Sequence, residues 1–136
     1  MSEERLTFGG VTIVIKASGD STGGSMSVFE EVPPLVDTPL HVHEHEDELF
    51  LPLEGEHVFQ VGDAEHRAGP GSAVFARRGV PHSQRRVVPG VGRTLIVTTP
   101  GGFDGFFREL AAAERAGTLG PDAYAAASAR YGITWL

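Results

Sequence analysis

Short apolar runs, each ended by glycine or proline, fill the first hundred residues of this 136-residue chain. In the first run, residues 6–17, the apolar side chains of Val11, Ile13 and Ile15 alternate with their neighbours, as on a β-strand. The 18 glycines are about twice the average share and lie mostly between the runs. The pattern predicts an all-β core. Further strands are expected within residues 23–34, 39–56, 57–68, 69–87 and 92–100, with a hairpin turn at Gly62–Asp63.

The composition changes after residue 102. Residues 103–117 have apolar side chains at helical spacing and end at a glycine, and residues 121–132 begin with proline and also end at a glycine. Two short helices are therefore expected. We divide the chain into a β domain, residues 1–102, and a helical extension, residues 103–136, that packs on its outside. Ile133, Trp135 and Leu136 are expected to form a plug at the C-terminus.

Charge and composition exclude several classes of partner. The net charge is −7, which disfavours nucleic acid and anionic membrane surfaces. No apolar run approaches 18 residues, and the first residues have neither a basic start nor an apolar segment. The chain has no cysteine, which excludes disulfides and thiolate metal sites. A cytoplasmic protein is expected, with no nucleic-acid or membrane partner.

Residues 39–56, PLHVHEHEDELFLPLEGE, contain three of the six histidines and many acidic side chains. On a helix, His43-Glu44 would begin the HExxH signature of zinc proteases, but Asp47 occupies the place of the second histidine. Pro39 and the strand-like sequence that follows also disfavour a helix. We interpret the segment as strand, turn and returning strand.

On a strand, His41 and His43 point to one face, with Cα atoms about 6–7 Å apart, so their rings can converge on one ion. Residues 44–47 are interpreted as an acidic turn, after which Glu48 returns beside His43. The fourth ligand is expected to be His82, which follows a Gly-Val-Pro turn. His45 is left open as an alternative ligand, a residue that orients Glu48, or a solvated side chain. The remaining two histidines, His57 and His66, are expected on the surface.

These residues resemble the cupin superfamily, whose first motif is commonly written G-x5-H-x-H-x(3,4)-E-x6-G. His41, His43, Glu48 and Gly55 match it, although its leading glycine is absent. The second motif, G-x5-P-x-G-x2-H-x3-N, is half kept: Gly71, Gly79 and His82 match, whereas Arg77 and Arg86 replace the proline and the asparagine. The resemblance implies a small antiparallel β-barrel of jelly-roll type that binds a metal ion through His41, His43, Glu48 and His82. The C-terminal continuation is similar to single-domain cupins of the quercetin-dioxygenase-like group.

Three imidazoles and one carboxylate suit one divalent transition metal: Fe, Mn, Ni, Co, Cu or Zn. Glu48 is also the candidate catalytic base. Phe50, Phe59, Phe75 and Arg77 are candidates for the substrate pocket.

The leading hypothesis is a dioxygenase-type oxidoreductase that acts on an aromatic or polyketide-like oxygenated small molecule. A non-redox cyclase or isomerase and a non-catalytic binding protein are the alternatives. By resemblance we expect a homodimer, in which residues 6–17 cover an edge of the partner.

Overall fold

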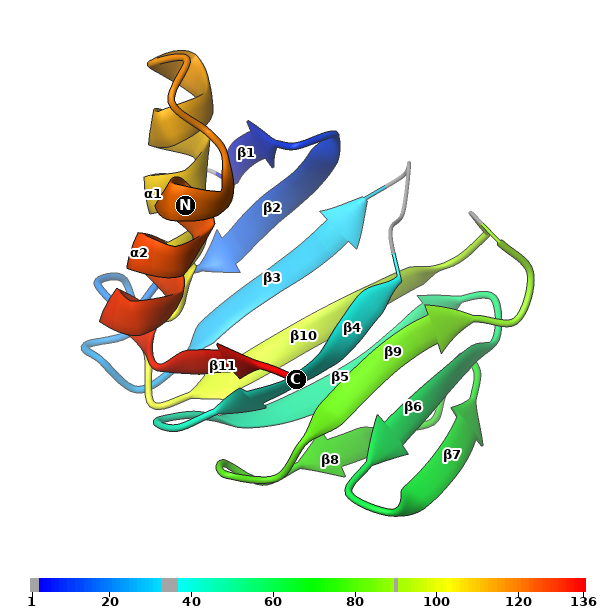
Figure 1. Ribbon diagram of the computed structural model, residues 1–136. Helices are drawn as coiled ribbons and strands as arrows, with labels where there is room; N and C mark the ends of the chain where they lie inside the picture. The colour runs from blue at the N-terminus through cyan, green and yellow to red at the C-terminus, as the bar shows by residue number, and fades with distance from the viewer. Residues whose placement is uncertain (1–2, 33–36, 90) are drawn as a thin grey trace.

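The computed structural model describes residues 3–32, 37–89 and 91–136. Strands dominate the chain up to residue 99, and two helices and a short last strand follow (Figure 1). The strands are β1 (Glu4–Phe8), β2 (Val11–Ala17), β3 (Ser27–Val32), β4 (Thr38–His43), β5 (Asp47–Glu54), β6 (His57–Val61), β7 (Ala64–Ala68), β8 (Val74–Ala76), β9 (His82–Arg86), β10 (Arg93–Thr99) and β11 (Ile133–Trp135). The helices are α1 (Asp104–Arg115) and α2 (Pro121–Tyr131). The predicted all-β core with two C-terminal helices is confirmed.

The strands form two antiparallel sheets that face each other (Figure 1). One sheet has the order β1-β2-β3-β10-β5-β8, and the other has the order β11-β4-β9-β6-β7. Phe29, Phe50, Phe59 and Ile96 are buried in the core of the protein. Antiparallel strands of this kind bury one face and leave the other toward solvent.

The first predicted strand, residues 6–17, is in fact two strands. Gly9 and Gly10 form the two-residue turn between β1 and β2, and both have positive φ, at 56° and 79°. A turn with positive φ at both central residues matches the twist of a hairpin, and glycine adopts it without strain. The hairpin places β1 at one edge of the six-stranded sheet. Its contact with a partner subunit stays a prediction.

Helix α1 lies against β1 and β3 and covers one end of the core (Figure 1). Phe106, Phe107, Leu110 and Ala111 are buried on one face, as their helical spacing predicts. Asp104 is buried in the first turn of α1, where it accepts hydrogen bonds from the Gly19 amide at 3.0 Å and from the Ser27 hydroxyl. In the part of the chain that the structure describes, neither helix is long and apolar enough to cross a bilayer.

The last residues form a β-strand, and not only the plug that the sequence predicts. Ile133–Trp135 form β11, which pairs with β4 at the edge of the five-stranded sheet. Gly132, at φ 70°, ends α2 in the left-handed conformation and turns the chain into this strand. Ile133 lies opposite His43, and Trp135 lies opposite His41. The C-terminus therefore lies beside the strand that carries two of the candidate ligands.

Candidate metal centre

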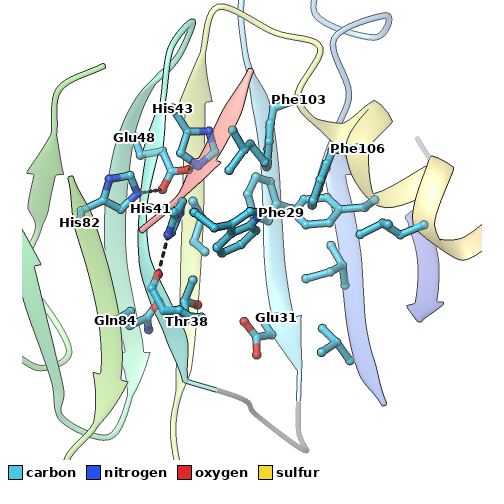
Figure 2. Close-up of a pocket in the computed structure, with 18 of the residues that line it drawn as sticks. Phe29, Glu31, Thr38, His41, His43, Glu48, His82, Gln84, Phe103 and Phe106 are labelled. Carbon is cyan, nitrogen blue, oxygen red and sulfur yellow. Dashed lines mark hydrogen bonds and ion pairs between the residues drawn. The ribbon is translucent and has the colours of Figure 1, made fainter. Parts of the chain in front are cut away.

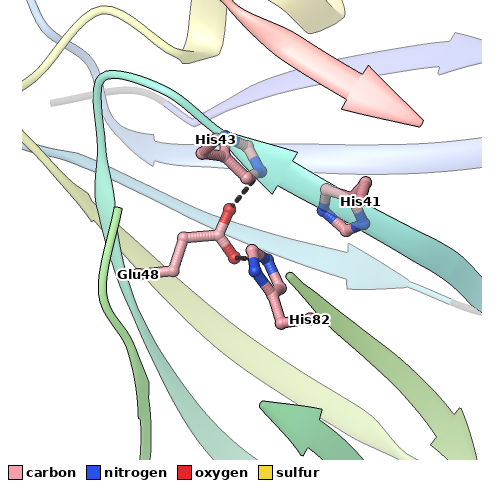
Figure 3. A group of neighbouring side chains, drawn as sticks. All are labelled: His41, His43, Glu48 and His82. Carbon is pink, nitrogen blue, oxygen red and sulfur yellow. Dashed lines mark ion pairs between the residues drawn. The ribbon is translucent and has the colours of Figure 1, made fainter. Parts of the chain in front are cut away.

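Three strands bring the four candidate ligands together between the two sheets (Figure 3). His41 and His43 are alternate residues of β4 and point inward, while Val42 between them is only half-buried. His82 begins β9 and lies directly opposite His41 in the β4–β9 pairing. Glu48 comes from β5 in the other sheet and has the same inward orientation. All four ligands are buried, and one potential donor atom from each lies within 4.8 Å of the others.

Glu48 lies between two of the imidazoles. Its Oε1 is 2.8 Å from His43 Nε2, and its Oε2 is 3.3 Å from His82 Nε2. The ring of His41 is 4.4 Å from that of His82 and 5.1 Å from that of His43, measured between centroids. Three imidazoles and one carboxylate therefore surround a common point. This is the arrangement expected from the strand-turn-strand interpretation together with His82 as the fourth ligand.

Each imidazole also has a polar group beside its Nδ1 nitrogen. His41 Nδ1 is 2.7 Å from the carbonyl oxygen of Pro39, and His82 Nδ1 is 3.2 Å from that of Val80. These carbonyls accept hydrogen bonds from Nδ1–H, which fixes the proton on Nδ1 and leaves the Nε2 lone pair free for a metal. His82 Nε2 is buried and faces Glu48 Oε2 at 3.3 Å without a well-aligned hydrogen bond, so its lone pair is available to an ion between the two residues. The cluster could therefore bind a divalent transition metal ion.

Glu46 is the outer partner of His43, and the sequence interpretation missed it. Its Oε1 lies 3.4 Å from His43 Nδ1, and its side chain is buried, although it belongs to the acidic turn, for which no role at the site was predicted. His45 is the exposed residue of this turn: its side chain is 64% exposed and lies against Gly132. Of the three roles left open for His45, the structure places it in solvent.

In the metal-free cluster, the pKa values of the ligands are shifted in different directions. Burial lowers the pKa of His41 to about 4, so that ring is neutral at pH 7, as a ligand must be. Burial also acts to lower the pKa of His43, but Glu48 and Glu46 outweigh it and raise that pKa to about 9. For Glu48, burial alone would raise the pKa, but His43 and His82 hold it well below the usual range. The carboxylate is therefore ionised.

A cavity of about 210 Å³ adjoins the ligands (Figure 2). His41, His43, Glu48 and His82 form part of its wall, and most of the remaining wall is apolar. It reaches the surface at Asp37 and Pro39, both exposed. In Figure 2 the ligands lie on one side, Phe103 and Phe106 lie toward α1, and Glu31 lies at the lower end.

The pocket predictions are only partly correct. Phe50 lines the cavity, and Phe59 lies in the core beside it, with ring centroids 4.9 Å apart. Phe75 does not face the cavity: it pairs with Leu49 on the outer face of the sheet and is 55% exposed. Arg77 is exposed in the turn that follows β8. Alternation along short β8 could not say which face was inner without its register.

His57 is also misplaced by the sequence interpretation. It is completely buried, where a surface position was expected, whereas His66 is exposed as predicted. The Gln84 side-chain amide lies 3.1 Å from His57 Nδ1 and 3.0 Å from the Thr94 hydroxyl. His57 Nε2 lies 3.0 Å from the carbonyl oxygen of Glu54. These contacts satisfy a neutral imidazole, and burial lowers its pKa.

Two facing antiparallel sheets with a buried His/Glu cluster between them define a jelly-roll protein with a potential metal site. The cupin domain family matches residues 28–97, about half of the chain and the part that carries all four candidate ligands. The chain belongs to this family. The narrower likeness to quercetin-dioxygenase-like cupins stays a prediction.

Solved structures agree with this assignment. The protein TT1209 from Thermus thermophilus is 36% identical, with 57% of this chain and 74% of that chain covered and a TM-score of 0.52. KdgF from Halomonas sp. is 16% identical, with 77% and 93% covered and a TM-score of 0.62. Oxalate decarboxylase of Bacillus subtilis, described with Mn(II) centres, is 16% identical, with 74% and 28% covered and a TM-score of 0.61. The last two likenesses show the fold alone. No curated protein matches the sequence significantly.

Proposed function

We propose that this cupin is a metal-dependent enzyme of dioxygenase type that acts on a small, largely apolar, oxygenated molecule. The observation that carries the proposal is the junction of two features: an apolar cavity, and a set of three imidazoles and one carboxylate that forms part of its wall. An apolar pocket with a few convergent polar groups is the usual form of a small-molecule site. The oxalate decarboxylase that shares this fold is described with Mn(II) centres, so the fold is compatible with a bound divalent metal.

A bound divalent transition metal would supply Lewis acidity and, where it is redox-active, a site for oxygen chemistry. His41, His43, His82 and Glu48 are the residues that would hold it. The carbonyls of Pro39 and Val80 and the carboxylate of Glu46 keep the imidazoles in orientation. The phenylalanine-rich wall keeps water from the substrate, which strengthens polar interactions inside the cavity.

Glu48 has a second role in the proposal, as the base. It lines the cavity, it is ionised, and its two oxygens face His43 and His82. The carboxylate can accept a proton from a hydroxyl group of a substrate at Oε1 or Oε2. The same property favours a second candidate function, a non-redox lyase or isomerase, because proton abstraction by Glu48 needs no oxygen.

Elemental analysis of the purified protein, in parallel with a His43→Ala variant, tests the metal. We expect about one transition metal ion per chain in the native protein and a large loss in the variant. Absence of metal from the native protein, or full retention by the variant, would show that the site is wrongly assigned. Oxygen uptake with flavonols and with smaller ring phenols then separates the two functions: turnover that continues without oxygen supports the lyase or isomerase.

A further inference from the structure

The C-terminal extension supplies a large share of the cavity wall. Its contributions include Phe103, Phe106, Phe107, Leu110, Ile133 and Trp135. All of these lie after residue 97, where the match to the cupin domain ends. The fold common to the family therefore provides the ligands, whereas this chain's own helices and last strand provide much of the wall that a substrate would touch.

Two aromatic rings of the extension lie directly on the ligands. The ring of Phe103 meets that of His43 edge to face, with centroids 4.6 Å apart, and the ring of Trp135 lies 4.9 Å from that of His41. Phe106 stacks on Phe103 at 5.3 Å (Figure 2). The Trp135 indole donates a hydrogen bond to the Ser128 hydroxyl at 2.9 Å, which ties β11 to α2. These contacts hold Phe103 and Trp135 in place against the ligands.

The charge of the cavity disfavours anions. Among the residues that the structure describes, no lysine or arginine lines it, whereas Glu31, Asp37 and Glu48 do. The buried Arg86 nearby lies 3.5 Å from Glu31 and 3.5 Å from Asp37, so its charge is already matched. Apart from the metal site itself, a carboxylate-bearing substrate would find no lysine or arginine in this wall to replace its hydration.

The size of the cavity narrows the substrate further. Its volume of about 210 Å³ is somewhat larger than the roughly 150 Å³ cavity that holds benzene. One ring with a few substituents fits this space. A three-ring flavonol is too large for this volume and could enter only with part of the molecule outside the cavity.

From these observations we infer that the C-terminal extension is the specificity-determining element, and that Phe103, Phe106 and Trp135 select an uncharged, single-ring substrate that carries an oxygen donor. The inference rests on the proposed function, because it places the substrate against the same ligands. It adds the class of substrate and the residues that choose it.

Binding of three probes to the zinc-loaded protein, measured by calorimetry, tests the inference. Catechol is a single ring that is uncharged at pH 7, phthalate is a single ring with two carboxylates, and quercetin is a three-ring flavonol. We expect catechol to bind and to change the fluorescence of Trp135, the only tryptophan in the chain. We expect phthalate and quercetin to bind at least tenfold more weakly. Comparable binding of either one would overturn the inference for charge or for size.

Variants of β11 test the wall itself. Trp135 is 44% exposed, so Trp135→Ala leaves the buried core intact. We expect it to weaken catechol binding about tenfold, or about 1.4 kcal/mol, whereas Trp135→Phe keeps most of the affinity. Thr134→Ala is the matched control, because Thr134 is exposed on the same strand. Equal affinity in Trp135→Ala and Thr134→Ala would refute the role of the wall, as would absence of catechol binding to the native protein.

The outcomes separate this inference from the proposed function. Metal content is measured independently on every variant, and Trp135 is not a ligand. A protein that binds metal and turns over a substrate, but in which Trp135→Ala has no effect on binding, refutes the inference alone. A protein without metal refutes the proposed function, while the ratio of catechol affinities in the native protein and Trp135→Ala still reports on the wall.

Discussion

The orientation of His43 by Glu46 gives the sharpest test of the metal centre. Glu46 Oε1 lies 3.4 Å from His43 Nδ1, both side chains are buried, and Glu46 contributes to the raised pKa of that imidazole. In Glu46→Gln the shape of the side chain is kept and its negative charge is lost. Loss of an outer partner of a metal-bound histidine typically lowers metal affinity about 10- to 100-fold, or about 1.4–2.8 kcal/mol. We expect a loss in this range.

The assay is competition for Zn²⁺ against a chromophoric chelator at pH 7. Glu44→Gln is the matched control, because Glu44 belongs to the same turn and its side chain is 60% exposed. It removes the same charge from the chain without touching His43. In the metal-free protein, Glu46→Gln should also lower the pKa of His43, which NMR titration of the imidazole measures. If the two variants bind zinc within twofold of each other, Glu46 does not support the site.

Three further predictions concern stability and pH. Asp104→Ala removes the buried carboxylate that accepts a hydrogen bond from the Gly19 amide, and it should lower the free energy of unfolding in urea by about 2–4 kcal/mol. The control is Asp122→Ala, because Asp122 is exposed in the first turn of α2. It should change the free energy of unfolding by less than about 0.5 kcal/mol. Burial acts to raise the pKa of Asp104, but hydrogen bonds, from Ser27 foremost, lower it overall, and the hydrogen bond from Arg93 lowers that of Glu30. The free energy of unfolding that these two carboxylates contribute should therefore be fully present above the ordinary carboxyl pKa and be lost as the pH falls through their lower pKa values in the folded protein. Acid unfolding followed by circular dichroism measures this loss. Unchanged stability down to pH 2 would contradict the prediction. Glu48 and Glu46 outweigh burial and raise the pKa of metal-free His43 to about 9, so a proton competes with the metal for this imidazole. Zinc affinity should therefore rise about tenfold per pH unit from pH 7 toward 9. An affinity that does not change with pH would mean that His43 does not bind the metal.

Much of the site could be predicted because its geometry is local. Alternation along a strand places His41 and His43 on one face whatever the rest of the fold does. A four-residue turn then limits where Glu48 can return. The position of His82 depended on the pairing of β9 with β4, but the turn before it and the family motif indicated that pairing. The strand periodicity and the later helical spacing likewise predicted the order of the elements.

The errors have a common physical origin. In the turn between β4 and β5, the backbone conformation decides which side chain points inward, so Glu46 is buried and His45 is exposed although both are polar. His57 is buried because Gln84 and a carbonyl satisfy its two nitrogens, and these partners are distant or unmarked in the sequence. Phe75 faces outward because its register with Leu49 places it there.

The sequence alone determined the all-β core, the two helices, the convergence of His41 and His43, and the chemistry of the donor set. These properties follow from periodicity, turn residues and spacing, which act over a few residues. Only the tertiary structure decided that α1, α2 and β11 return to the ligands, so that Phe103 lies against His43 and Trp135 against His41. That contact depends on strand pairing and helix packing between residues far apart in the chain, and neither follows from local patterns.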